Sequence, residues 1–133
     1  MKKSVYRMIL AGGMMLSGMF VTSMPSLAHH SFAAEYDAQA PLTLKGVVTK
    51  IEWTNPHIYY YIDVKDENGN VANWALEGYP PNTLRRVGFA KDMLKVGDEV
   101  SVTGWKARDG SRRAASRELT LADGRKIFTG PPA

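Results

Sequence analysis

The side chains best suited to recognition chemistry follow a turn at Pro56. His57, Tyr59, Tyr61 and Asp63 alternate with aliphatic and aromatic residues, a composition typical of a strand. Because successive side chains of a strand point to opposite sides, these four share one face. A plain surface strand would carry Thr, Lys and Glu there. Aromatic rings on such a face stack on bases, sugars or peptide side chains, so the pattern predicts a ligand-binding surface.

A second candidate is a metal site at the start of the exported chain. If an export signal is cleaved after Ala28, His29 carries a free α-amine beside its imidazole, and His30 follows. Nitrogen ligands of this kind suit copper, nickel or zinc, and a metal displaces the proton of an amine whose pKa is near ~8. His57 is the only other histidine and would supply the further ligand. The competing interpretation is an exposed pair on a frayed arm, with His57 hydrogen-bonded in its turn.

Signatures of catalysis are missing from the sequence. The 133 residues contain no cysteine, no Gly-x-Ser-x-Gly elbow, no phosphate-binding loop and no dinucleotide fingerprint,. The sequence therefore predicts a protein that is not an enzyme, unless a bound copper ion did the chemistry. Carboxylates are present, but no spacing pairs them across a cleft; those considered are Glu35, Asp37, Glu52 and Glu77.

The first 28 residues read as a cleaved signal peptide. Three basic residues precede an apolar run over residues 8–21, and small residues stand at Ser26 and Ala28, the three-part pattern of a secretory signal. A membrane anchor is the alternative, but the run is shorter than the ~20 residues of a spanning helix. The absence of cysteine excludes an N-terminal lipid anchor and disulfide bonds. We expect an exported chain, periplasmic in a diderm bacterium, with no transmembrane segment after cleavage.

Net charge argues against nucleic acid as a partner. The whole chain has 17 basic and 13 acidic residues, a formal charge of +4. Three of the basic residues lie in the signal, so the remainder carries 14 against 13, or +1. Such a balance gives no general attraction to phosphate backbones.

The rest of the chain divides into an arm, residues 29–41, ended by Pro41, and a domain, residues 42–130. In the first strand the alternation of Leu42 and Leu44 gives way to Val47 and Ile51, which predicts a bulge at Gly46,. Asn82 begins a short helix that Gly88 closes, and apolar residues 89, 93, 94 and 96 plug the space beyond it. The expected strands are residues 42–53, 57–65, 71–77, 99–106, 115–121 and 126–128.

Three strands, a helix and two further strands are the order of an OB-fold. The predicted fold class is therefore all-β with one short helix, a small five-stranded OB-fold-like Greek-key barrel; a β-sandwich would need more strands. In this architecture the second and third strands, with the loops after the first and fourth strands, form the ligand surface. Asn73 and Glu77 would complete the face, and an arginine-rich loop would suit an anionic or sugar-like ligand. Its arginines are Arg108, Arg112 and Arg113.

Two other interpretations of this face remain open. Phe32 and Tyr36 are spaced to lie on one side of a helical turn, so the arm could cover Tyr59 and Tyr61 and make a second small core. An exposed strand edge could instead pair with another protein. Small molecules, sugars and peptides are thus the expected ligands, with a protein partner as the third alternative.

Three motifs resemble a known family: His-His-Ser-Phe-Ala-Ala-Glu-Tyr-Asp from residue 29, Trp-Thr-Asn-Pro-His from residue 53, and Leu-Lys-Val-Gly-Asp-Glu-Val-Ser-Val-Thr-Gly from residue 94. The chain resembles, over residues 29–130, a family of small exported bacterial proteins catalogued as a domain of unknown function. The resemblance implies export and a small barrel, and carries no activity with it. A weaker similarity, in topology, is to OB-fold proteins of the bacterial periplasm.

Overall fold

The computed structural model describes residues 32–131. A helical turn over residues 32–35 leads directly into the first strand. One short α-helix and one 3-10 turn separate the third and fourth strands. In chain order the elements are β1 (Tyr36–Glu52), β2 (Tyr59–Lys65), β3 (Val71–Glu77), α2 (Pro81–Arg86), η1 (Lys91–Met93), β4 (Glu99–Ala107), β5 (Arg113–Thr120) and β6 (Lys126–Phe128).

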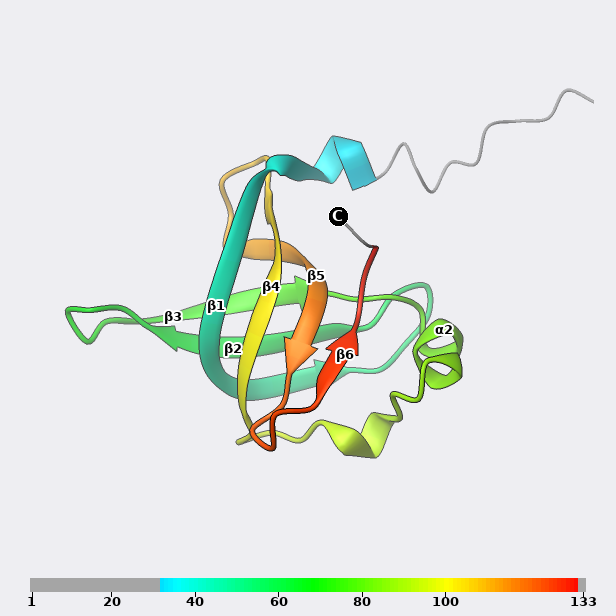
Figure 1. Ribbon diagram of the computed structural model, residues 1–133. Helices are drawn as coiled ribbons and strands as arrows, with labels where there is room; N and C mark the ends of the chain where they lie inside the picture. Colours follow the sequence, from blue (N-terminus) through cyan, green and yellow to red (C-terminus); the bar gives the residue numbers. More distant parts are fainter. Residues whose placement is uncertain (1–31, 132–133) are drawn as a thin grey trace, which may run out of the picture.

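The strands form one curved sheet that closes on itself (Figure 1). Their order is β3-β2-β1-β4-β5-β6, and β3 also pairs with β5 in parallel, over residues 75–77 and 113–115. Five strands therefore make a hydrogen-bonded ring, and β6 adds to β5 outside it. The fourth strand returns to lie beside the first, which is the Greek-key order. The predicted fold class, all-β with one short helix in OB-like order, is confirmed.

The interior is filled by the inward side of β2, by Ile58 just before it, and by the residues opposite. Ile58, Tyr60 and Ile62 are all 0% exposed, as is Leu76 on β3. The assignment of β2 faces from alternation is therefore confirmed. Because the burial of each large apolar side chain is worth about 1.5–3 kcal/mol, this seam fixes which side of β2 faces solvent. The four predicted ligand-binding residues of β2 and its turn lie on that outer side.

The first strand differs from its prediction at both its start and its bulge. It begins at Tyr36 rather than at residue 42. Its register against β2 shifts between Val48 and Lys50, not at Gly46. Val48 therefore continues the inward alternation and is 1% exposed, whereas Val47 is 39% exposed. Glycine is needed at position 46 for another reason. A Cβ there would lie 2.3 Å from the Asp63 carbonyl oxygen, so only glycine allows the strands to approach this closely.

The segment after β3 closes one end of the ring much as expected. Leu84 of α2, Phe89 and Leu94 are each at most 2% exposed. Val96, predicted to be a plug, is instead exposed, because it lies in the turn before β4. The prediction that the helix begins at Asn82 was also wrong: it begins at Pro81, and Pro80 before it makes no side-chain cap hydrogen bond.

A second small cluster holds the N-terminal segment against β4. Phe32 packs edge-on against Trp105, with ring centroids 5.6 Å apart, and lies 5.6 Å from the Tyr36 ring. Tyr36 is 3% exposed and shares this cluster with Ala107 and Ala115. The second core predicted for Phe32 and Tyr36 exists, but it is built around Trp105 rather than over Tyr59 and Tyr61.

Candidate functional site

The outer face of β2 separates into two halves, and the half at Tyr61 is occupied by its own neighbours. The Tyr61 hydroxyl donates to Glu52 Oε2 at 3.0 Å, and Lys50 Nζ lies 5.0 Å from the ring centroid. Further along, Asn73 Nδ2 donates to Asp63 Oδ1 at 2.8 Å. These contacts arise because β1 and β3 run on either side of β2 here. They form an ordinary surface network of paired polar groups.

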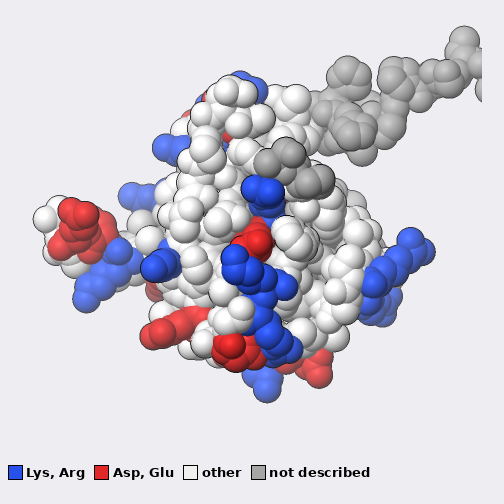
Figure 2. Space-filling view, viewed as in Figure 1, with Lys and Arg blue, Asp and Glu red and all other residues white. Residues whose placement is uncertain are grey.

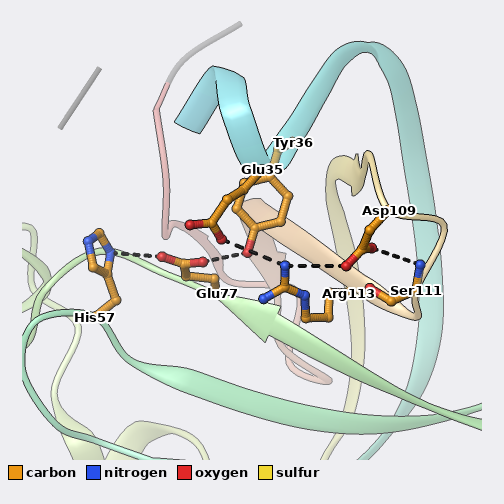
Figure 3. A network of polar contacts seen from close by, with 7 residues as sticks. All are labelled: Glu35, Tyr36, His57, Glu77, Asp109, Ser111 and Arg113. Atoms are coloured by element: carbon orange, nitrogen blue, oxygen red, sulfur yellow. Dashed lines mark hydrogen bonds and ion pairs between the residues drawn. The ribbon is translucent and has the colours of Figure 1, made fainter. Parts of the chain in front are cut away.

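The half at His57 and Tyr59 is organised around Glu77, which lies opposite Tyr59 on β3. The Glu77 side chain is only 17% exposed. It accepts a hydrogen bond from the Tyr36 hydroxyl and has its Oε1 at 3.4 Å from His57 Nδ1. Figure 3 shows the carboxylate between these two side chains, which come from opposite directions. Among residues 32–131, His57 is its only ion-pair partner within 4 Å, and this ring is cationic only when protonated.

Two phenols beside Glu77 are held in their neutral form. The pKa of Tyr36 is raised by burial, by its hydrogen bond to Glu77 and by the charge of that carboxylate. Burial and the same carboxylate raise the pKa of Tyr59, and Glu35 adds to the effect. Arg113 opposes both shifts only weakly. The site thus combines one shielded carboxylate with hydroxyl groups that remain hydrogen-bond donors at neutral pH.

The ring of His57 is fixed by backbone as well as by charge. Its Nδ1 lies 2.9 Å from the Gly78 carbonyl oxygen. A carbonyl only accepts, so Nδ1 carries a proton and donates it. In the described part of the chain the hydrogen bonds of this ring involve Nδ1 alone. The side chain is 42% exposed, and Nε2 carries the lone pair of the neutral ring.

The three arginines of the predicted loop make three different sets of contacts. Arg108 Nε donates to the carbonyl oxygens of Ala33 and Tyr36, at 2.8 and 3.1 Å, and so ties down the N-terminal segment. Arg112 is exposed, and its carbonyl accepts from the Ala75 amide at 3.0 Å. Only Arg113 joins the polar group near Glu77.

Arg113 lies between two carboxylates. Its Nη2 is 3.7 Å from Glu35 Oε2 and 3.8 Å from Asp109 Oδ2. Asp109 Oδ1 in turn accepts from the Ser111 amide at 2.9 Å, and Figure 3 shows this chain of contacts running past Tyr36. The positive charge of Arg113 is therefore largely matched within the protein, which leaves little of it for an anionic ligand.

The sequence did not single out Tyr36 as a partner of Glu77, since they are 41 residues apart. Glu77 itself was named as completing the face. The spacing of Tyr36 from Phe32 predicted that the Tyr36 ring would be packed. It did not indicate where the Tyr36 hydroxyl would point.

The predicted metal ligands are only partly covered by the structure. His29 and His30 lie outside the described residues. Within residues 32–131, no group of three His, Cys, Asp or Glu side chains is arranged to hold a metal ion. Of the three predicted metal ligands, His57 alone lies within residues 32–131.

The surface charge of the face shown in Figure 2 is mixed. Basic and acidic side chains are interspersed there rather than gathered into fields of one sign. Two open hollows lie elsewhere, along β1, β4 and the end of β5: one of about 360 Å³ beside Lys45 and Ser101, and one of about 550 Å³ beside Leu42 and Arg117. Neither is lined by His57, Tyr59 or Glu77.

Fold and site together define a small all-β domain with a polar, aromatic-edged surface at one end of β2 and β3. Residues 18–116 match a family described as a family of unknown function (DUF6152), and the chain belongs to that family. No curated protein matches the chain. From residue 32 to residue 131, none of the helices has the length and apolar character needed to cross a membrane.

Proposed function

We propose that this protein is an exported binding module that holds a neutral polar ligand, a sugar or a peptide, at His57, Tyr59 and Glu77. The observation that carries the proposal is the state of Glu77: a carboxylate 17% exposed whose one ion-pair partner among residues 32–131 is His57. A shielded carboxylate accepts strong hydrogen bonds from ligand hydroxyl or amide groups. Tyr59 beside it offers a partly exposed ring for the body of the ligand,.

The two halves of the β2 face explain why the ligand would choose this end. Tyr61 and Asp63 have their hydrogen bonds completed by Glu52 and Asn73, so a ligand there would have to displace existing partners. At the other end, the partly exposed ring of Tyr59 and the outer nitrogen of His57 lie beside Glu77. The N-terminal segment, held by Arg108, supports this end through the Tyr36 hydroxyl.

The test is a titration of the protein with defined neutral disaccharides and short peptides, followed by backbone amide shifts. Binding should move the amide signals around Tyr59 and Glu77. Glu77→Gln should weaken it about tenfold or more, because a hydrogen bond to a charged group is lost, and Tyr59→Ala should weaken it as well.

Matched control variants are Glu52→Gln and Tyr61→Ala, which change the same residue types on the occupied half. They should bind like the parent. Equal weakening by both pairs of variants, or shifts confined to the Tyr61 half, would contradict this assignment of the site. Thermal unfolding of each variant separates lost binding from lost structure.

A second candidate function is metal binding, and the orientation of His57 favours it. Metal-binding histidines usually donate one ring N–H to a carbonyl or carboxylate, which fixes the ring and leaves the other nitrogen for the metal. His57 Nδ1 has both kinds of neighbour, the Gly78 carbonyl and the Glu77 carboxylate. His29 and His30 would supply the remaining nitrogens. They precede Phe32 by three and two residues, so extended backbone gives them at most ~10 Å of reach from it.

Titration with Cu(II), Ni(II) and Zn(II) by calorimetry tests this function. The parent protein should bind one ion, and His57→Ala, His29→Ala or one added residue before His29 should each abolish tight binding while the fold is kept. An added residue changes only the position of the α-amine. If it leaves copper affinity unchanged, the proposed N-terminal site is wrong.

Both functions assume export, which we also propose: residues 1–28 form a cleaved signal, residues 29–41 an arm, and residues 42–130 the domain. The support is the basic, apolar and small-residue pattern of the first 28 residues,. Intact mass of protein collected from the exporting host should correspond to a chain beginning at His29. A mass that retains residues 1–28 would contradict it.

A further inference from the structure

The hollow of about 550 Å³ beside Leu42 and Arg117 lies where the strand register is irregular. β4 is flanked by irregular pairing on both sides, between Trp105 and Ala107 on one side and between Thr103 and Gly104 on the other. On one side, Tyr36 of β1 pairs with Ala107 and Pro41 with Trp105, so residues 37–40 have no regular partners. On the other side, Thr103 lies opposite Glu118 and Gly104 opposite Ser116. Arg117 is therefore the extra residue of a β-bulge.

A β-bulge commonly redirects a side chain, and such bulges are frequent beside functional sites. Here the redirected side chain is Arg117, which lines the hollow of about 550 Å³ together with Leu42, Thr43, Thr103, Gly104 and Trp105. Gly104 allows the close packing that forms the floor, since a Cβ there would lie 2.0 Å from the Ala115 carbonyl oxygen. The hollow is thus built by two register shifts and a close approach of backbone.

The charge in this hollow is unmatched. Arg117 is the only charged residue that lines it. Over residues 32–131, Arg117 forms no ion pair, whereas Arg108, Arg113 and Arg125 each do. Its Nε is one of two buried side-chain atoms in that range with no hydrogen-bond partner. Since a cation without an ion-pair partner gains a charge-assisted hydrogen bond when an anion binds beside it, an anionic acceptor in this hollow would bind favourably to the Arg117 guanidinium.

We propose that this hollow binds a small organic carboxylate with an apolar body. The carboxylate would pair with the Arg117 guanidinium, which has the fork geometry that matches two carboxylate oxygens. The hydroxyls of Thr43 and Thr103 are additional donors, and Leu42 and Trp105 offer apolar surface for the body of the ligand. A single positive charge suits one carboxylate better than a phosphate dianion.

This site is separate from the one proposed for sugars, peptides or metals. The two share no lining residues, and β1 and β4 carry most of the hollow whereas β2 and β3 carry the other surface. Binding at one site can therefore be tested without assuming the other.

The experiment is a titration of the purified protein with benzoate at constant ionic strength, observed through the Nε–H signals of the arginines and the backbone amides. We expect saturable shifts of Arg117 Nε–H and of the amides of Thr103 and Trp105. Benzamide, which has the same shape without the charge, should bind at least about tenfold more weakly. Inorganic phosphate should also bind more weakly than benzoate.

Arg117→Gln should weaken benzoate binding at least about tenfold, and Arg112→Gln, which removes one charge from an exposed arginine, should leave it unchanged. If Arg117→Gln fails to fold, Arg117→Lys keeps the charge and loses the fork, so it should weaken binding severalfold. Non-saturable shifts, equal affinity for benzamide, or equal weakening by the Arg112 and Arg117 variants would overturn the proposal.

Discussion

Tyr59 and Tyr61 are two residues apart on the same face of the same strand, yet their surroundings differ. Tyr61 completes its hydrogen bonding with Glu52, under Lys50, in a network made by the neighbouring strand. Tyr59 lies beside the shielded carboxylate of Glu77. That carboxylate also accepts a hydrogen bond from the hydroxyl of Tyr36, a residue outside β2 and β3. The comparison shows that a shared face does not make one site: what matters is which distant segments reach each end of the strand.

The largest loss of stability should come from a substitution at Tyr60. This residue lies between Tyr59 and Tyr61 and faces inward, at 0% exposure. Its hydroxyl lies against Ser116, whose own hydroxyl lies against Thr129. Tyr60→Ala should lower the free energy of unfolding by about 3–5 kcal/mol, because it empties a core position. Urea unfolding measures the loss. A loss below that of Tyr59→Ala would mean that the assigned faces of β2 are reversed.

The next largest effect should come from Tyr36→Phe, which sharpens the comparison at the Glu77 end. It keeps the ring that packs against Phe32 and removes the hydroxyl that donates to Glu77. Since a mostly buried carboxylate then loses a donor, the free energy of unfolding should fall by about 1–3 kcal/mol.

The same variant in a Glu77→Gln background provides the control for that prediction. With the carboxylate removed, Tyr36→Phe should cost clearly less, and the difference is the coupling between the two groups. Additive effects of the two substitutions would show that Tyr36 acts through packing alone.

Sequence alternation was enough to predict which residues of β2 face the core and where β3 and β6 begin and end, because these follow from local pattern. It misplaced the bulge of β1, since Gly46 is explained by the Asp63 carbonyl of another strand rather than by local twist. It also grouped three arginines that the fold separates. Arg108 binds carbonyls 75 and 72 residues away, and no local pattern carries that information.

The two ends of β2 should also differ, by a smaller amount, in how the free energy of unfolding depends on alkaline pH. The pKa values of Tyr36 and Tyr59 are raised by burial and by Glu77, while unfolded tyrosine titrates near ~10. Above that pH the native state keeps protons that the unfolded state releases, so the free energy of unfolding falls as pH rises. Below it, these phenols are neutral in both states and their contribution is complete.

For one such phenol the slope is at most about 1.4 kcal/mol per pH unit. Urea unfolding between pH 8 and pH 11 should therefore show a decline that is shallower in Tyr36→Phe than in the parent. Tyr61→Phe should change the slope less. Burial and Glu52 also raise the pKa of Tyr61, but this phenol is more exposed than Tyr36. An unchanged slope in Tyr36→Phe would mean that Glu77 and burial do not hold that phenol neutral.

The smallest effect should come from Tyr61→Phe at neutral pH, although the Tyr61 hydroxyl donates to a carboxylate as the Tyr36 hydroxyl does. Glu52 is also paired with Lys50, and its side chain is 38% exposed, so water replaces the lost donor. The free energy of unfolding should change by no more than about 0.5 kcal/mol. A loss as large as that of Tyr36→Phe, measured in the same urea series, would mean that both ends of β2 hold shielded carboxylates, and the reason for placing the ligand at Tyr59 would disappear.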